Sequence, residues 1–116
     1  MADRPLKIDV RREANGVVVT PTGACTMDVA AQFTQCLEAL ASEPIDRLVV
    51  DLSGLDFIES CGLGGLVSAF VRCRRRNSQL RLVAPRPPIY DILRLTRLSE
   101  ILPISDCVDS ALRESD

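Results

Sequence analysis

The sequence predicts an α/β fold: one small, mostly parallel β-sheet with about four helices packed on it. Strand and helix patterns alternate along most of the chain, which is typical of parallel strands joined by right-handed crossovers. Residues 48–50 form an unbroken apolar run, the pattern of a strand covered on both faces. Asn15-Gly16 is a strong hairpin signal, so we expect the first strand to pair antiparallel with the second.

The first half of the chain supplies a hairpin and a helix. Residues 6–11 alternate apolar and polar side chains, as a half-exposed strand does. A second strand is predicted over residues 17–20, and we expect Pro21 and Gly23 to stop it. Thr26 or Asp28 can cap the helix that follows. The apolar face of this helix comprises Val29, Phe33, Cys36, Leu37 and Leu40.

The second half repeats the strand and helix alternation. A strand over residues 48–52 ends in a turn, and a second helix is predicted from Ser60 to about Arg76, with Asn77 as a left-handed cap. The remaining predicted elements are a strand at 80–83, a third helix begun by a proline at 87 or 88, a short strand at 101–104 and a terminal helix at 108–113.

Length and composition exclude several classes of protein. The 116 residues suffice for one domain, which we place at 1–116. A net charge of −2 and 3% aromatic residues argue against a nucleic-acid binder. No apolar run approaches the roughly 20 residues of a membrane span, and the first ten residues show no signal core. We therefore expect a cytoplasmic protein without membrane contact.

Histidine is absent, which removes Ser-His-Asp and Cys-His catalysis and ordinary Cys/His zinc sites. The five cysteines show no paired spacing and are interpreted as free thiols. Asp51 and Asp56 have too few convergent ligands around them for a metal site and are interpreted as turn residues. We predict no cofactor, no metal and no enzymatic activity that depends on histidine.

One stretch looks suited to chemistry, namely the start of the second helix at Ser60. Gly62, Gly64 and Gly65 leave little bulk around this serine, and a helix N-terminus accommodates a phosphate well. The loops at 22–28 and 56–62 follow neighbouring parallel strands, so both should lie at the same edge of the sheet. This arrangement would bring Thr26 and Asp28 beside Ser60.

The segment from Glu59 to Gly64, Glu-Ser-Cys-Gly-Leu-Gly, resembles the signature of bacterial anti-sigma factor antagonists of the STAS domain family. The resemblance extends to the N-terminal hairpin, to TGACTMDVAAQF and to PPIYDILRLTRLSEILPI. The chain departs from the family pattern at four positions. Glu59 replaces an aspartate, Cys61 a second serine, Thr26 a frequent aspartate, and Arg97 a frequent glycine near the end of the third helix.

The resemblance implies a phosphorylation switch. In that family an anti-sigma factor serine kinase phosphorylates the first serine of the motif, here Ser60, and a metal-dependent serine phosphatase resets it. The unphosphorylated antagonist binds the kinase and releases the sigma factor. We expect Asp56 and Glu59 to oppose a phosphate on Ser60, and Leu63 to be partly open to a partner. The expected partner-binding residues are Thr26, Met27, Asp28, Glu59, Ser60, Cys61, Gly62 and Leu63.

Other readings remain open at this point. The chain could be a scaffold STAS domain of a stress-signalling complex or lipid-transport assembly, without phosphorylation, and Ser60 alone is also a good N-cap. It could be a small enzyme using Cys61, which fast alkylation by iodoacetamide would reveal. The glycine spacing fits neither a dinucleotide nor a P-loop motif. The arginines at 72 and 74–76 are interpreted as a solvated face.

Overall fold

The computed structural model describes residues 4–113 and contains a six-stranded sheet with the order β1-β2-β3-β5-β6, in which β4 pairs with β2 off this path. β1 (Lys7–Glu13) and β2 (Gly16–Cys25) form the predicted antiparallel hairpin. All other strand pairs are parallel. The predicted α/β class and mostly parallel sheet are therefore confirmed.

β2 is longer than the sequence suggested, because it continues through Pro21 to Cys25. β2 uses residues Val17–Val19 to pair with β3 (Arg47–Asp51) and residues Gly23–Cys25 to pair with β4 (Leu55–Ile58). Pro21 lies between these two segments, where that side of β2 has no ladder partner to lose. The prediction that Pro21 and Gly23 stop the strand was wrong, because Gly23 itself pairs with β4.

β4 was not predicted, since residues 56–62 were expected to be a loop. Residues 56–58 of this loop, together with Leu55, form a short strand that extends the sheet beside the second half of β2. The register shifts between Gly23 and Ala24, so the alternation of side chains along β4 is irregular. A short strand with an irregular register carries little periodic signal, which explains why the pattern missed it.

The last strand, β6 (Ile104–Ser105), lies further along the chain than predicted and pairs with β5 (Gln79–Val83). The N–H of Leu82 donates to the carbonyl oxygen of Pro103 at 2.9 Å. Extending this ladder backwards would require an N–H on residue 103 for the carbonyl of Leu80, and a proline has none. The preceding residues instead form a 3-10 turn, η1 (Leu98–Glu100).

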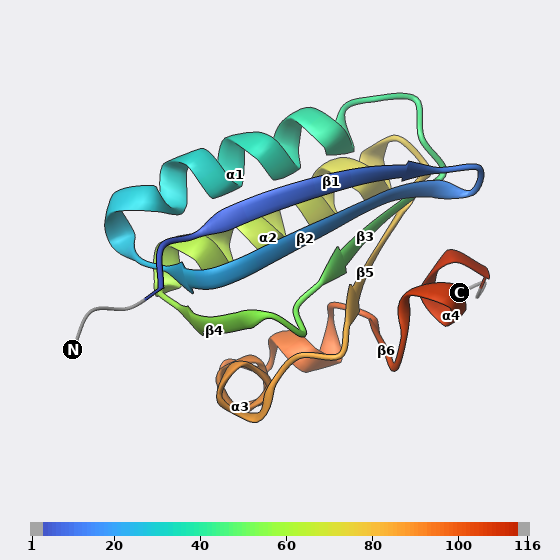
Figure 1. Ribbon diagram of the computed structural model, residues 1–116. Helices are drawn as coiled ribbons and strands as arrows, with labels where there is room; N and C mark the ends of the chain where they lie inside the picture. Colours follow the sequence, from blue (N-terminus) through green and yellow to red (C-terminus); the bar gives the residue numbers. More distant parts are fainter. Residues whose placement is uncertain (1–3, 114–116) are drawn as a thin grey trace.

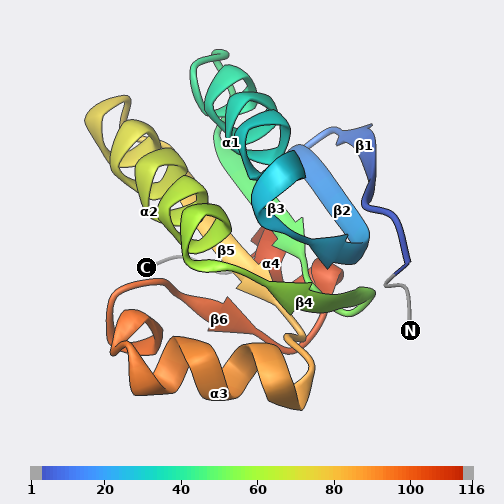
Figure 2. The same ribbon diagram turned by 90° about the vertical axis from the view of Figure 1, so that its left-hand side faces the viewer.

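Helices cover both faces of the sheet (Figure 1). α1 (Met27–Ala41) and α2 (Ser60–Arg75) lie side by side on one face (Figure 2), and α3 (Pro87–Leu95) packs against β4. α4 (Val108–Arg113) packs on the other face, where its apolar residues join Val18, Val49 and Val83. Each helix within residues 4–113 is too short or too polar to span a lipid bilayer.

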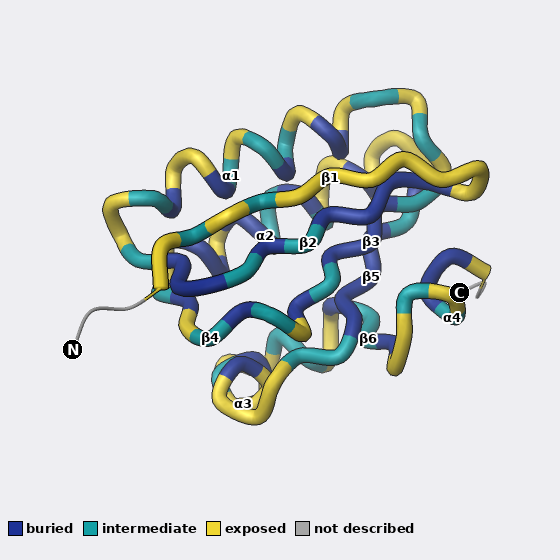
Figure 3. Tube along the Cα trace, viewed as in Figure 1, coloured by how far each residue is buried: buried dark blue, intermediate teal, exposed yellow. Residues whose placement is uncertain are grey.

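The main hydrophobic core lies between the sheet and the helix pair α1 and α2 (Figure 3). Leu48, Val49 and Val50 are each 0% exposed, which confirms the two-sided burial that their apolar run predicted. Asn77, at φ 60°, forms the left-handed cap expected after α2. Arg97 also has a left-handed conformation, at φ 63°, where the family resemblance had pointed to glycine.

Candidate functional site

Two helices begin next to each other at one edge of the sheet (Figure 2). β2 ends at Cys25 and leads into α1, while its parallel neighbour β4 ends at Ile58 and leads into α2. Cys25 and Ile58 are paired in the sheet, so the two helix N-termini start from the same level. The structure thus brings the segments around Thr26 and Ser60 together, as the loop placement predicted.

The N-terminus of α1 is closed by a neighbouring side chain. The carboxylate of Glu59, which precedes α2, accepts a hydrogen bond from the N–H of Met27 in the first turn of α1. The N–H of Glu59 in turn donates to the carbonyl oxygen of Cys25 at 3.1 Å. Thr26 occupies the cap position of α1, but its hydroxyl donates to the carboxylate of Asp28. The predicted caps of α1 are therefore replaced by Glu59.

The N-terminus of α2 is open. Ser60 is the first residue of α2, and Glu59 holds the cap position without a side-chain cap bond. The first turn of α2 contains no acidic residue. Ser60 is exposed, and within the described part of the chain its hydroxyl has no hydrogen-bond partner. The interpretation of Ser60 as a structural N-cap is wrong, because the helix begins one residue earlier than that role requires.

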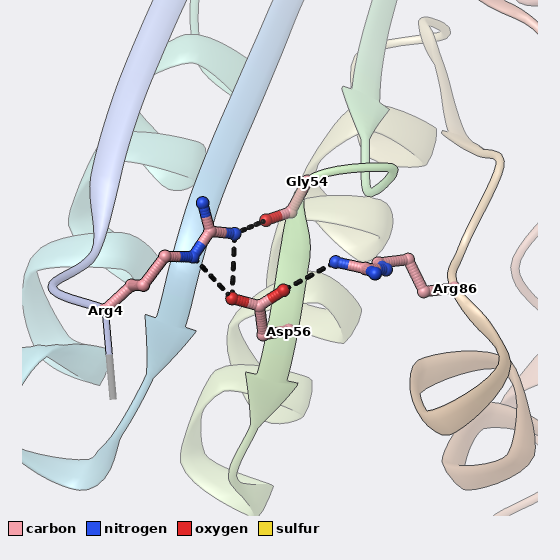
Figure 4. A network of polar contacts seen from close by, with 4 residues as sticks. All are labelled: Arg4, Gly54, Asp56 and Arg86. Carbon is pink, nitrogen blue, oxygen red and sulfur yellow. Dashed lines mark hydrogen bonds and ion pairs between the residues drawn. The ribbon is translucent and has the colours of Figure 1, made fainter. Parts of the chain in front are cut away.

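The two carboxylates that precede Ser60, those of Asp56 and Glu59, both make polar contacts with other residues. Asp56 lies on β4 between Arg4 and Arg86 (Figure 4), with a distance of 2.8 Å from the Arg4 Nε to Oδ2 and of 2.6 Å from the nearest Arg86 nitrogen to Oδ1. Asp56 is thus a strand residue that forms ion pairs and does not form the predicted turn. Asp51 does form a turn, by accepting the N–H of Ser53 at 3.0 Å.

Glycines shape the surface beside Ser60. A Cβ at Gly62 would come within 2.9 Å of the Cys25 sulfur, and one at Gly65 would strike Thr34 of α1. These two glycines allow close packing against β2 and α1. Gly64 differs, because a Cβ there would have no neighbour within 4 Å. The outer side of the first turns of α2 is consequently flat and open.

The segments next to Ser60 expose apolar side chains. Met27 is 68% exposed and Phe57 is 40% exposed, and Cys61 lies on the same edge, exposed beside Ser60. Phe57 was not predicted at this surface, because β4 itself carries too little periodic signal to be predicted. Leu63 is only 8% exposed and belongs to the core, so the expectation that a partner reaches it from the surface is corrected. Its burial follows from its position on the inner side of α2.

The thiols near the site differ in their environment. Cys25 is fully buried beneath the junction of the two helices, and this burial raises the pKa of its thiol to about 11, with smaller contributions from Cys61 and Glu59. All five cysteines are free thiols, as predicted. Among the described residues, no group of three or more His, Cys, Asp or Glu side chains could hold a metal ion.

Comparisons with known proteins agree with this architecture. Anti-sigma-F factor antagonist RsfA of Mycobacterium tuberculosis is 32% identical over 111 residues, which are 92% of this chain and 85% of that protein. A second protein of that organism, described as an anti-anti-sigma factor, Rv2638, is 43% identical over 65 residues. These are 56% of this chain and only 44% of Rv2638, so the match spans less than half of that relative's length.

Among solved structures, an anti-sigma factor antagonist from Mycobacterium paratuberculosis superimposes with a TM-score of 0.84 at 26% identity. The superposition covers 93% of this chain and 92% of that one. The sheet is six-stranded and mostly parallel, and two adjacent strands lead into two helices at one edge. This is the architecture of a small α/β domain of the anti-sigma factor antagonist type. The family model described as STAS domain matches residues 7–111, and the chain belongs to the STAS domain family.

Proposed function

We propose that this chain is an anti-sigma factor antagonist that is switched by phosphorylation of Ser60. In its unphosphorylated form it binds an anti-sigma factor serine kinase and releases the sigma factor. Phosphate on Ser60 ends that binding, and a metal-dependent serine phosphatase restores it. The cycle takes place in the cytoplasm, and the chain is a binding module rather than an enzyme. The names of its relatives support the class of partner.

The observation that carries the proposal is the open N-terminus of α2. Ser60 is exposed there, with a hydroxyl that makes no hydrogen bond to another described residue. A kinase can therefore reach this hydroxyl without breaking a contact of the fold. Free N–H groups and the helix dipole favour an anion at this position by about 0.3 to 1 kcal/mol.

The neighbouring carboxylates hinder a phosphate less than the sequence suggested. Asp56 forms ion pairs with Arg4 and Arg86, and the Glu59 carboxylate accepts a hydrogen bond from the N–H of Met27. A phosphate adds about −1.5 to −2 charges at neutral pH, and the free protein can hold these charges at the helix N-terminus in contact with water. We therefore expect the fold to change little on phosphorylation.

The effect of the phosphate falls on the complex instead. A partner that covers Met27, Phe57 and Ser60 would have to strip water from the phosphate, and its surface is matched to a small neutral hydroxyl. Any acidic group or bound nucleotide phosphate across the interface would add like-charge repulsion. The switch is thus a local electrostatic block and requires no large conformational change.

The proposal is tested by binding of Ser60 variants to the cognate kinase, measured by titration calorimetry. Ser60→Ala should bind at least as well as the unmodified chain, and Ser60→Asp should bind about 10-fold or more weakly, which corresponds to 1.4 kcal/mol or more. Ser53→Asp, at the other end of β4, introduces the same charge at another exposed serine and should bind normally. Tight binding by Ser60→Asp would contradict the proposal.

The same assay maps the partner surface. Met27→Asp or Asp28→Asn, at the first turn of α1, should weaken kinase binding while leaving the unfolding midpoint nearly unchanged, because both side chains are exposed and asparagine keeps an oxygen that can accept the Thr26 hydroxyl. Arg75→Glu lies at the far end of α2 and serves as the control. An equal loss of kinase binding in Arg75→Glu would show that the surface has been placed on the wrong end of the molecule.

A further inference from the structure

A basic groove lies along the C-terminal half of α2, beside the residue that caps the end of α1, where the sequence had suggested only a solvated face. It encloses about 480 Å³ and is lined by Ser42, Ser68, Val71, Arg72, Arg75 and Arg76. Three arginines and two serines surround it, although the chain as a whole carries a net charge of −2. The groove therefore concentrates positive charge against the overall balance of the protein.

The arginines of this groove differ in what they contact. Arg72 is held in place, since one of its nitrogens donates to the Ser42 hydroxyl at 3.3 Å and another lies 3.9 Å from the Glu38 carboxylate. Arg75 and Arg76 are exposed, and neither makes an ion pair with any residue in the described range 4–113. Their charges are available to an external anion.

The walls of the groove indicate which kind of anion fits. Glu38 lies behind the lining residues Ser68 and Arg72, where its carboxylate accepts a hydrogen bond from Ser68 and lies 3.9 Å from Arg72, and this negative charge opposes a compact, doubly charged phosphate. Val71 is 40% exposed and offers apolar surface between the arginines. Carboxylates spaced along a chain that also carries apolar side chains match this mixture of charge and apolar surface.

The groove is remote from the kinase-binding edge. α2 runs from Ser60 to Arg75, and sixteen residues of helix span about 22 Å. At such a distance, more than two Debye lengths at physiological ionic strength, the charge on Ser60 is largely screened from the groove. A partner in the groove and a kinase at Ser60 could therefore bind at the same time.

We infer that this groove, formed by Arg72, Arg75 and Arg76 with Val71, is a second docking surface, which binds an acidic, partly apolar segment of a protein other than the kinase. Arg75 and Arg76 pair with carboxylates of the segment, and Val71 packs against an apolar side chain between them. Binding at this surface is independent of the phosphorylation state of Ser60.

The test uses a fluorescently labelled peptide of alternating glutamate and leucine as the probe, with anisotropy measured at low salt. The full chain should bind it, and added salt should weaken the binding because exposed charges are screened. Arg75→Glu/Arg76→Glu should bind about 10-fold or more weakly. Lys7→Glu/Arg94→Glu makes the same change in net charge at exposed positions outside the groove and should bind normally.

Two further measurements make the result specific. Val71→Ser removes apolar surface but keeps both arginines, and it should weaken binding of the probe. Ser60→Asp should leave the affinity for the probe unchanged. Failure of the probe to bind, or equal loss in both charge-reversed variants, would overturn the inference. A single-stranded RNA of similar charge that binds more tightly than the peptide, and is lost in the same variant, would assign the groove to nucleic acid and would also overturn it.

Discussion

The N-termini of α1 and α2 start side by side, yet they are built in opposite ways. At α1 the Glu59 carboxylate accepts the N–H of Met27, and the Thr26 hydroxyl donates to Asp28. At α2 the cap residue makes no side-chain bond, and Ser60 is exposed with its hydroxyl unengaged by the described residues. One residue, Glu59, closes the first helix and, by facing away, leaves the second open.

This difference shows how ordinary packing can leave one helix N-terminus open to an anion. A free helix N-terminus costs stability unless water or a ligand satisfies its N–H groups. The chain keeps this N-terminus exposed to water and satisfies the neighbouring one internally. The anion-accepting end of α2 thus remains available to a phosphate without a dedicated binding loop.

The largest expected effect on stability is a difference between glycines on the inner and the outer side of α2. Gly65→Ala should destabilise the fold by about 1 to 3 kcal/mol, because the new Cβ would collide with Thr34 of α1 and the packed helices would have to shift. Gly64→Ala meets open space and should stabilise the helix by up to about 1 kcal/mol. Urea unfolding of both variants measures the contrast, and similar midpoints would contradict the packing described here.

Cys25 tests the closed junction through pH. Burial raises the pKa of its thiol from 9.0 to about 11, so an unfolded chain ionises this thiol before the folded one does. The contribution of Cys25 to stability is therefore complete below about pH 9 and is lost as the pH rises toward 11. The unfolding free energy of the unmodified chain should fall more steeply over this range than that of Cys25→Ala. Parallel profiles would show that Cys25 is not buried as described.

A smaller effect is expected at Glu59. Glu59→Ala leaves the Met27 N–H without its acceptor and should destabilise the fold by about 1 kcal/mol, the usual contribution of a helix cap. Glu59→Gln keeps a side-chain oxygen in place and should recover most of that stability. Thermal unfolding of the pair decides the point, and an unchanged Glu59→Ala would mean that α1 is capped in another way.

Much of the fold could be predicted from local patterns. The apolar run at Leu48–Val50, the Asn15-Gly16 hairpin and the left-handed Asn77 all follow from short-range chemistry that the sequence displays directly. β4 and the path of β2 past Pro21 could not be predicted in this way. Both depend on which strand pairs with which, and that choice is made by partners that are distant in sequence.

The features of the candidate site also fall into those that local patterns predict and those that depend on distant residues. The position of Ser60 near the start of a helix, beside the segment of Thr26 and Asp28, could be predicted from the order of strands and helices. The engagement of Glu59 with α1 and the pairing of Asp56 with Arg4 and Arg86 could not, because these contacts join residues about 30 to 50 positions apart. Only the structure shows that both carboxylates are occupied.

The most direct test of the central claim uses the two hydroxyls at the two helix N-termini. The chain is incubated with its cognate kinase and ATP, and the phosphorylated residue is mapped by mass spectrometry. Because Ser60 is exposed at the open helix and Thr26 is bonded to Asp28 at the closed one, phosphate should appear on Ser60 alone. Phosphate on Thr26 or on another residue, with Ser60 unmodified, would contradict the proposed switch.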